Sequence, residues 1–351
     1  MFWISLGFLS RIRGDGRDDD SLTQLLLTPP PPCVAPWWAR GAHFQTILGD
    51  QLPSSAPKTL GESIRIRLVD GDVLAGRTWA GTTDTVVLLF HGLGGSHDAT
   101  YMNRAVVLSQ SRGHSIWAMN HRGCGDGRGL AKGTYHSGRA DDIGAVIKAA
   151  RQTHPGKRIA VIGFSLSGNA LLLNLGDGIG IFEKPDVAIA VNPPIDLARC
   201  AVKLKTGINR IYDLRFVLRC RRSVRERVED GLIQDIYQIP RFCTLMDFDN
   251  YYTAPASGFS NRDDYYKRCS AGPHLINIHK PTVILMAEDD PFVAVQSFRE
   301  FKTSDSVHLH IESTGGHMGY LSNGNSGRRW LDMALGHYLD ALLSHESWVR
   351  G

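Results

Sequence analysis

The 351-residue sequence lacks the cysteine patterns of disulfide-bonded and zinc-binding proteins. It has no C-x-x-C motif, and its six cysteines lie far apart, at Cys33, Cys124, Cys200, Cys220, Cys243 and Cys269. Reduced thiols are therefore expected rather than a disulfide framework, and no zinc site is expected. A reducing compartment fits this composition, so we expect a cytoplasmic protein.

A long hydrophobic run is also missing. The N-terminal stretch MFWISLGFLSRIR is apolar for only nine residues, whereas a helix that spans a bilayer needs about 20. It also lacks the basic start and the small-residue cleavage site of a secretory signal. An interfacial anchor is the alternative, so a peripheral membrane contact through the N-terminus or a lid stays open.

The chain has no large excess of either charge. Its formal net charge of +4 is spread over both signs, so no nucleic-acid partner is expected. Only residues 199–227 are strongly basic, with ten Lys or Arg against Asp213 and Glu226. This segment either contacts anionic lipid or acidic substrates, or forms a solvated helical face with Arg stems over apolar surface, which we favour.

The amino-acid composition changes along the chain, and this change predicts a tail followed by one domain. Residues 1–32 hold a charge cluster and the proline run Pro29 to Pro32, which excludes helix. We expect a disordered or loosely attached tail over 1–32 and an α/β domain over 33–351. Residues from about 195 to 273 are rich in Arg, Tyr and Phe and show no clear buried strand, which indicates a lid insertion.

Short continuous apolar runs predict strands at 85–90, 115–120, 158–164, 187–192 and 282–287, and a further strand of the sheet is predicted at VHLHIE, residues 307–312. Continuous rather than alternating apolar residues are typical of strands covered on both faces, as in a mostly parallel sheet flanked by helices. Helical stretches are predicted at 102–112, 140–151, 169–175 and 328–343. Ligands of such sheets bind beyond the carboxyl ends of the strands, so the chemistry is expected there.

The stretch VIGFSLSGNALLL, residues 161–173, places Ser165 on the turn between a predicted strand and a helix. This is the setting of a nucleophile elbow, in which a strained turn exposes the serine hydroxyl above the sheet edge. Ser167 stands at the second glycine position of G-x-S-x-G. We interpret it as a small residue that the turn tolerates; as a rival nucleophile it lacks the flanking glycines.

The base and the acid are expected on loops after later strands, in the chain order Ser, Asp, His. His317 lies in STGGHMGY after the run at 307–312, and its glycine neighbours permit a close loop. His308 and His310 alternate along that strand and are expected to face solvent. Asp289 and Asp290 compete as the acid; we favour Asp290, because Pro291 makes it extended at the strand exit, and expect Asp289 to be solvated.

Two backbone amides are the expected oxyanion donors. The amide of Leu166 lies at the start of the helix after Ser165. The amide of Leu93, in the loop LLFHGLGGSH after the strand at 85–90, is the best-placed second donor. His91 is expected to be structural.

These residues carry a resemblance to a known family. From about residue 37 to residue 343, the chain resembles the YheT-like branch of the α/β-hydrolases, also called AB-hydrolase family 4. The matching pieces are PWWARGAHFQTIL (36–48), FHGLGG (90–95), NHRGCG (120–125), YHSGRADD (135–142), GFSLSGN (163–169), DNYYTAPASGFSNRDDYY (249–266), DDPF (289–292) and GGHMGY (315–320). The tryptophan-rich entry and the GFSNRDDYY stretch are not shared by α/β-hydrolases in general.

The resemblance implies an α/β-hydrolase fold and a serine carboxylesterase or acylglycerol lipase acting on short- to medium-chain acyl esters. Ser165, Asp290 and His317 would be its charge-relay residues, the substrate a small acyl ester, and no cofactor would be needed. Members usually show G-x-S-x-G-G, from which Ser167 departs. Two alternatives stay open: an acyltransferase that passes the acyl group to an alcohol or thiol, and a non-catalytic binding scaffold.

Overall fold

The structure is a computed structural model, and it describes residues 27–323 and 329–344. Most of the predicted tail, residues 1–26, lies outside the described residues. Within residues 27–32, the backbone carbonyls of Thr28 and Pro31 accept hydrogen bonds from the side chains of His337 (2.7 Å) and Trp330 (2.5 Å). This end of the stretch therefore lies against the last helix.

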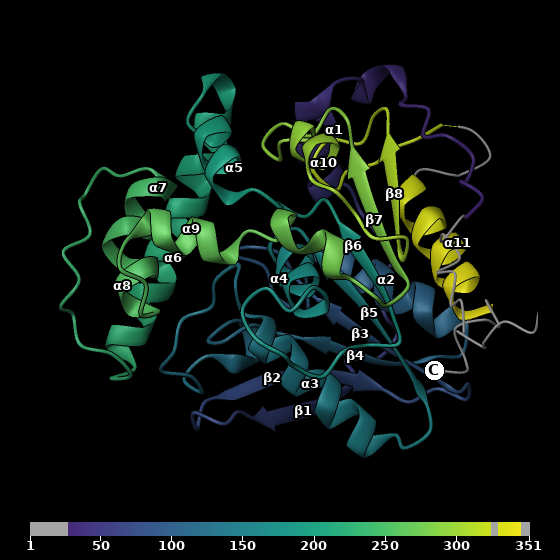
Figure 1. Cartoon of the computed structure of the whole chain (residues 1–351), viewed down its shortest axis with the longest axis horizontal. Coiled ribbons are helices and arrows are strands. Elements are labelled where there is room, and N and C mark those ends of the chain that lie inside the picture. The colour runs from purple at the N-terminus through teal and green to yellow at the C-terminus, as the bar shows by residue number, and fades with distance from the viewer. Residues whose placement is uncertain (1–26, 324–328, 345–351) are drawn as a thin grey trace, which may run out of the picture.

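An eight-stranded sheet forms the centre of the molecule (Figure 1), in the order β1-β2-β4-β3-β5-β6-β7-β8. Its strands are β1 (Glu62–Arg67), β2 (Val73–Trp79), β3 (Thr85–Phe90), β4 (Ser115–Met119), β5 (Arg158–Phe164), β6 (Val187–Val191), β7 (Thr282–Ala287) and β8 (Val307–Glu312). The six strands from β4 to β8 in this order are parallel, whereas β1 and β2 are antiparallel to their neighbours. The mostly parallel sheet predicted from the continuous apolar runs is confirmed.

The two antiparallel strands were not predicted. β1 lies at the sheet edge and most of its residues are exposed, and β2 contains Gly76 and Arg77. Neither strand has the continuous apolar run of a strand buried on both faces.

Helices cover both faces of the sheet. One core cluster joins α2 (Thr100–Ser111) and α11 (Trp330–Ser344) to one face, and a second joins α3 (Ala140–Thr153) and α4 (Leu166–Leu175) to the other. The predicted helices are confirmed with shifted bounds, the largest being that α4 begins at Leu166, directly after Ser165. Shorter elements are η1 (Trp37–Ala39), α1 (Ala42–Gln51), η2 (Gly125–Gly127), η5 (Gly272–Asn277) and α10 (Gln296–Glu300).

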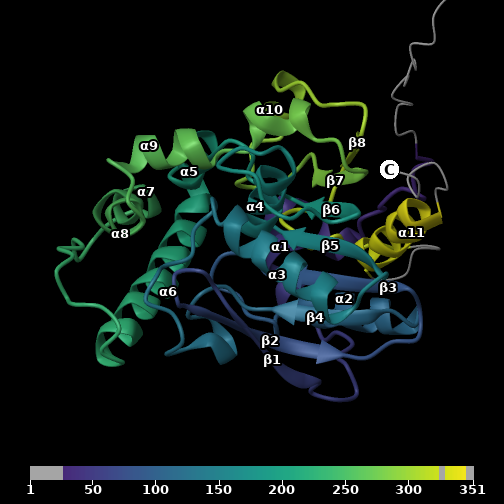
Figure 2. The same cartoon turned by 60° about the horizontal axis from the view of Figure 1, so that its bottom comes forward.

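The segment between β6 and β7 forms a separate group of helices on the side of the sheet away from α11 (Figures 1 and 2). It contains α5 (Leu197–Leu204), η3 (Gly207–Asn209), α6 (Arg210–Glu229), α7 (Leu245–Phe248), the π-helical turn η4 (Asp249–Thr253), α8 (Ala254–Ala256) and α9 (Arg262–Cys269). Val224, Phe248 and Tyr252 form a small core of its own. This all-helical segment occupies the position predicted for the lid.

One expectation about β8 is wrong. His310 does not face solvent: its side chain is only 10% exposed, contacts the Tyr338 hydroxyl at 2.7 Å through Nδ1, and lies 3.3 Å from Glu312 through Nε2. His308 is also partly buried, and its ring contacts the Tyr338 ring in a tilted arrangement with 5.6 Å between the ring centroids. α11 covers this face of β8, which the alternation of the strand alone did not reveal.

Candidate active site

Ser165 lies on a strained turn between β5 and α4. Its backbone has φ 53° and ψ −117°, a conformation that costs energy for any residue with a side chain. Gly163 allows the turn, because a Cβ at that position would lie 2.7 Å from the carbonyl oxygen of Ser167. Gly168 lets α4 pack close to the loop after β6, since its Cβ would lie 3.0 Å from Pro193 Cβ. This geometry is that of a nucleophile elbow.

Three predicted residues form one hydrogen-bonded chain. His317 Nε2 lies 2.9 Å from Ser165 Oγ, and His317 Nδ1 lies 2.7 Å from Asp290 Oδ2. Ser165 follows β5, Asp290 follows β7 and His317 follows β8, so the parallel strands bring them to one edge of the sheet. Asp290 is 2% exposed and His317 is 9% exposed. Such a chain can move a proton from a serine hydroxyl onto an imidazole and stabilise the resulting charge.

The Asp290 carboxylate is surrounded by donors. Oδ2 accepts hydrogen bonds from His317 and from Asn192 Nδ2 at 2.7 Å, while Oδ1 accepts from the amides of Phe292 at 3.0 Å and Val293 at 2.8 Å. Burial by itself would raise the pKa of Asp290, but the positive charge and hydrogen bond of His317, together with the two amides, hold that pKa below its usual value. The carboxylate therefore stays ionised.

Asp289 has a different role from the one expected. It is not a solvated carboxylate: Oδ1 accepts hydrogen bonds from the amides of Gly315 at 2.9 Å and Gly316 at 2.8 Å, and Oδ2 accepts from Thr314 Oγ1 at 3.1 Å. Asp289 thus caps the loop that carries His317. Its side chain points to a neighbouring loop that is distant in sequence, which explains why sequence alone did not find this contact.

The two expected oxyanion donors lie beside Ser165. Leu93 and Leu166 both line a cavity with Ser165, and neither backbone amide has a hydrogen-bond partner within residues 27–323 and 329–344. By contrast, the amides that flank Leu93 are occupied, since Gly92 N donates to the Tyr101 hydroxyl at 2.9 Å and Gly94 N donates to the Tyr135 hydroxyl at 3.0 Å. Two tyrosines therefore fix the loop and leave the Leu93 amide unused.

Ser167 is fully buried behind the elbow. Its hydroxyl donates to the carbonyl oxygen of His91 and lies 2.6 Å from His121 Nε2. Burial lowers the pKa of His121 to about 4, so its imidazole is neutral in the folded protein. Ser167 connects the elbow to the strand end that precedes Leu93, and its position excludes the rival interpretation of Ser167 as the exposed nucleophile. His91 is also fully buried, as expected of a structural residue.

Sequence reasoning missed two residues that hold the acid. Asn192, with φ 45° directly after β6, donates through Nδ2 to Asp290 and accepts from the Tyr320 hydroxyl at 2.9 Å. Lys203 on α5 donates through Nζ to the carbonyl oxygens of Asp290 at 2.7 Å and Val293 at 3.0 Å. The position of Asn192 at a strand end was a usable signal, whereas nothing in the sequence indicated the contact of Lys203.

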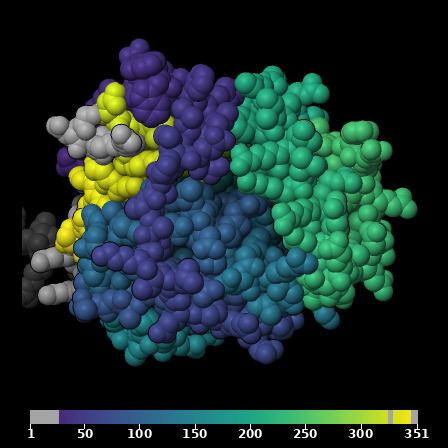
Figure 3. Space-filling view, turned by 180° about the vertical axis from the view of Figure 1, so that it is seen from behind, coloured from purple at the N-terminus to yellow at the C-terminus, as the bar shows by residue number. Residues whose placement is uncertain are grey.

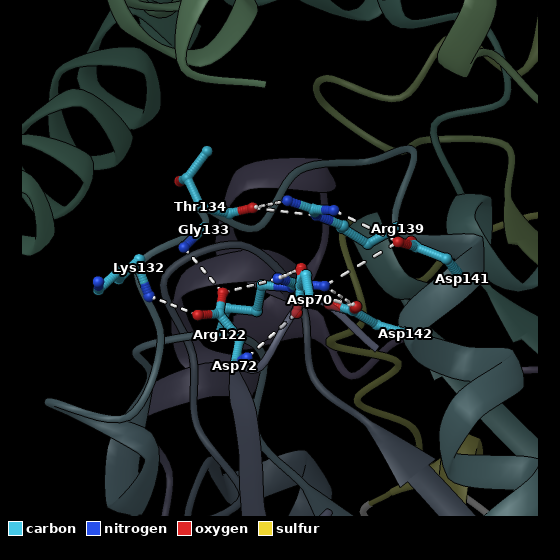
Figure 4. Close-up of polar contacts among 9 residues, drawn as sticks. All are labelled: Asp70, Asp72, Arg122, Lys132, Gly133, Thr134, Arg139, Asp141 and Asp142. Carbon is cyan, nitrogen blue, oxygen red and sulfur yellow. Dashed lines mark hydrogen bonds and ion pairs between the residues drawn. The ribbon is translucent and has the colours of Figure 1, made fainter. Parts of the chain in front are cut away.

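A buried arginine fixes another loop of this edge (Figure 4). Arg122 contacts Asp142 with both Nε and Nη2, and Nη1 contacts Asp72 at 2.7 Å and Asp70 at 2.5 Å. Burial opposes the charge of Arg122, but the hydrogen bonds and charges of Asp142 and Asp70 raise its pKa above the usual value. The network ties the turn after β4 to the β1–β2 hairpin and to the start of α3. It thereby holds the adjacent His121 in place.

Two cavities meet at Ser165. The first, here the apolar cavity, has about 950 Å³ of open space and is lined mainly by the helices between β6 and β7, among them Leu197, Leu204 and Phe248. The second, here called the polar cavity because its lining is less apolar than that of the first, has about 1360 Å³ of open space and is lined by residues of α1, α2 and α6 and by His317. Ser165, Leu93, Phe216 and Phe292 line both. A molecule held across Ser165 would thus meet an apolar side and a polar side.

Neither a metal site nor a membrane span is found in the described part of the chain. Residues 27–323 and 329–344 contain no group of three or more His, Cys, Asp or Glu side chains placed to hold a metal ion. No helix in the same ranges combines the length and the apolarity needed to cross a bilayer.

Comparison with known proteins identifies relatives among ester-cleaving proteins. The family model of the α/β-hydrolase fold matches residues 85–173. The Escherichia coli protein YheT is 28% identical over 318 residues, which is 87% of this chain and 92% of its own. The monoacylglycerol lipase of Saccharomyces cerevisiae is 28% identical over 277 residues, 76% of this chain and 61% of its own. The mouse phospholipase ABHD3 is 26% identical over 329 residues, 90% of this chain and 79% of its own.

Solved structures with the same fold include the Pyrococcus furiosus esterase Pf2001. It superposes with a TM-score of 0.53 at 17% identity, over 82% of this chain and 98% of its own. Est1E of Butyrivibrio proteoclasticus, solved with ferulic acid bound, gives a TM-score of 0.53 at 14% identity, over 80% of this chain and all of its own. At these identities the likeness establishes the fold.

Proposed function

Because the chain is a YheT-like α/β-hydrolase, we propose that it is a serine carboxylesterase or acylglycerol lipase that cleaves short- to medium-chain acyl esters through an acyl enzyme. The observation that carries the proposal is the hydrogen-bonded chain from Ser165 through His317 to Asp290, located where two cavities meet. The names of its relatives support ester hydrolysis in general terms.

In the first half-reaction, Ser165 Oγ attacks the ester carbonyl carbon while His317 Nε2 accepts the hydroxyl proton. The electron pair of the carbonyl moves onto its oxygen, and the Leu93 and Leu166 amides stabilise that negative charge, each contributing about 3 kcal/mol. His317 then gives the proton to the alcohol oxygen as the ester C–O bond breaks. Asp290 keeps the imidazole in the tautomer that this transfer needs.

In the second half-reaction, water takes the place of the alcohol. His317 accepts a proton from the water as its oxygen attacks the acyl carbon, and then returns that proton to Ser165 Oγ as the acyl bond breaks. The carboxylic acid leaves and the enzyme returns to its starting state. No metal or organic cofactor enters these steps.

Each of the two cavities suits one half of the ester substrate. The apolar cavity suits the acyl chain, because the helices between β6 and β7 line it with Leu and Phe side chains. The polar cavity suits the alcohol half. Its lining includes the charged side chains of Asp50, Arg215 and Arg219, which offer hydrogen-bond partners to the hydroxyl groups of an alcohol.

A fluorophosphonate probe tests the proposal. We expect the probe to label the wild-type protein and the Ser167→Ala variant, and labelling to vanish in Ser165→Ala. A series of p-nitrophenyl esters from two to twelve carbons should then show a preference for short or medium chains. Labelling that persists in Ser165→Ala would refute the proposal, and a folded protein that neither reacts with the probe nor cleaves any ester would favour the binding scaffold.

An acyltransferase is the second candidate. One relative, from Saccharomyces cerevisiae, is named a medium-chain fatty acid ethyl ester synthase/esterase and is 24% identical over 279 residues. The same acyl enzyme would then react with an alcohol in the polar cavity instead of water. Adding ethanol or glycerol to the ester assay and measuring the transesterified product separates the two reactions.

A further inference from the structure

α1 and α6 expose a set of large apolar side chains. Phe44 and Ile47 on α1, and Ile211, Leu214 and Leu218 on α6, are each between 40% and 66% exposed. On α6, residues 211, 214, 218, 222 and 225 follow one another at intervals of three or four, so they lie along one side of the helix. That side reads Ile, Leu, Leu, Arg, Arg.

The two helices lie side by side although they are about 170 residues apart in the sequence. The His43 and Tyr212 rings stack at 5.7 Å with a 3.1 Å hydrogen bond, and Arg215 contacts Asp50 at 3.2 Å. Figure 3 shows the purple segment that includes α1 next to the teal and green segment that includes α6. We use the name α1/α6 face for the exposed apolar residues Phe44, Ile47, Ile211, Leu214 and Leu218 together with Arg222 and Arg225 on the same side of α6.

This face borders the polar cavity, which reaches Ser165. Ile47 of α1 and Arg215 and Arg219 of α6 line the polar cavity, whose lining also includes Ser165 and His317. A surface that covers the α1/α6 face would thus lie next to the polar cavity. Scattered exposed apolar residues need no explanation, but a cluster next to a cavity does.

The charge of α6 indicates which kind of surface the α1/α6 face would bind. The helix carries seven arginines, Arg210, Arg215, Arg219, Arg221, Arg222, Arg225 and Arg227, against the three acids Asp213, Glu226 and Glu229. Arg227 and Asp213 are buried, Arg215 is paired with Asp50 at 3.2 Å, and Arg222 is paired with Glu226 at 2.8 Å. The exposed part of the helix therefore keeps an excess of positive charge. Arg222 itself is 79% exposed. Arginines beside exposed Ile and Leu are typical of helices that lie in the interface of an anionic bilayer. A second copy of the same face would bring like charges together, which disfavours self-association.

We propose that the α1/α6 face docks on a lipid surface that bears anionic headgroups, with Leu214 and Leu218 inserted and Arg222 and Arg225 against the phosphates. Docking itself does not depend on the proposed esterase activity. Delivery of a lipid ester from that surface to Ser165 does depend on it. The substrate class that follows is an ester presented in a lipid surface, in addition to esters dissolved in water.

Sedimentation of the full-length protein with vesicles tests the docking. We expect binding to vesicles of equal parts phosphatidylcholine and phosphatidylglycerol, weaker binding to phosphatidylcholine alone, and a decrease with added salt. The double variant Leu214→Ser/Leu218→Ser should bind at least about tenfold more weakly, because it loses two inserting side chains. The double variant Arg222→Glu/Arg225→Glu should lose the preference for anionic vesicles.

Ile181→Ser is the matched control. Ile181 lies between α4 and β6 and is 85% exposed, so its substitution removes a similar apolar side chain outside the α1/α6 face. It should bind vesicles as the wild type does. The proposal is overturned if Leu214→Ser/Leu218→Ser binds like the control, if headgroup charge has no effect, or if light scattering shows a dimer that the same double variant dissociates.

The failure of docking and the failure of the esterase are distinguishable. Ser165→Ala should bind vesicles as the wild type does, because Ser165 is no part of the face. Leu214→Ser/Leu218→Ser should hydrolyse a dissolved p-nitrophenyl ester at the wild-type rate and lose activity only toward an ester carried in vesicles. Vesicle binding by a protein without any esterase activity would leave docking supported and the proposed function refuted.

Discussion

Substitution of Asp290 by Asn tests the proposed charge relay at its most constrained residue. Asp290 Oδ1 accepts hydrogen bonds from two backbone amides, and Oδ2 accepts hydrogen bonds from His317 Nδ1 and Asn192 Nδ2. An Asn at this position keeps the amides on its single oxygen and presents an NH2 group to His317. The imidazole must then accept at Nδ1 and carry its proton on Nε2, where it faces Ser165 as a donor and no longer as a base.

The expected loss is large because both the tautomer and the charge are wrong. Inversion of the tautomer in a serine triad lowers kcat by about 10⁴, or roughly 5.5 kcal/mol of barrier. For Asp290→Asn we therefore expect kcat for p-nitrophenyl butyrate to fall by about 10³ to 10⁴, with a smaller change in KM. Fluorophosphonate labelling should slow to a similar degree.

Asp289→Asn is the matched control. The amides of Gly315 and Gly316 both donate to Asp289 Oδ1, which Asn retains, and its NH2 group can donate to Thr314 Oγ1. We expect kcat within about threefold of wild type, because every hydrogen bond keeps a partner. Circular dichroism and thermal unfolding should show both variants folded. Equal losses in the two variants, or near-normal activity in Asp290→Asn, would refute the assignment of the acid.

Three further predictions concern residues around the site. Ser167→Gly should lower the free energy of unfolding by only about 1 kcal/mol and leave kcat/KM within about tenfold of wild type. The reason is that His121 Nε2 also lies 3.1 Å from the His91 carbonyl oxygen, so these two groups keep a partner when the Ser167 hydroxyl is removed. Urea unfolding and ester kinetics measure the two effects, and loss of probe labelling would contradict the prediction. Lys203→Met should lower the free energy of unfolding by about 2 kcal/mol, because it leaves two carbonyl oxygens of the Asp290 loop without their donor; an unchanged urea midpoint would show that the contact is dispensable. Burial raises the pKa of Asp249 from 3.8 to about 6. Between about pH 4 and pH 6 the folded state therefore binds more protons than the unfolded state. The free energy of unfolding should fall as the pH rises from about 4 to 6, by roughly 3 kcal/mol at most, and Asp249→Asn should remove this part of the pH dependence; a stability difference between the two proteins that does not change with pH would contradict the assignment.

The predicted sheet depended on signals that are local in the sequence. Strands β3, β5 and β7 are buried on both faces, and their continuous apolar runs reported this directly. β1 and β2 form an antiparallel pair at the edge and gave no such signal. The same reasoning explains His310: alternation along β8 indicates two faces, but only the packing of α11 shows that one of them is covered.

What the sequence by itself determined was the order of the elements and the residues whose local surroundings are distinctive: Ser165 between a strand and a helix, and His317 among glycines. Tertiary structure alone gave Asn192 and Lys203 their contacts, gave Asp289 its contacts with the His317 loop, and placed α1 beside α6; the sequence favoured Asp290 over Asp289 as the acid but left both open. The physical reason is the range of the interactions. Strand runs and tight turns follow from neighbouring residues, whereas a hydrogen bond between two loops depends on how the strands before them pair in the sheet.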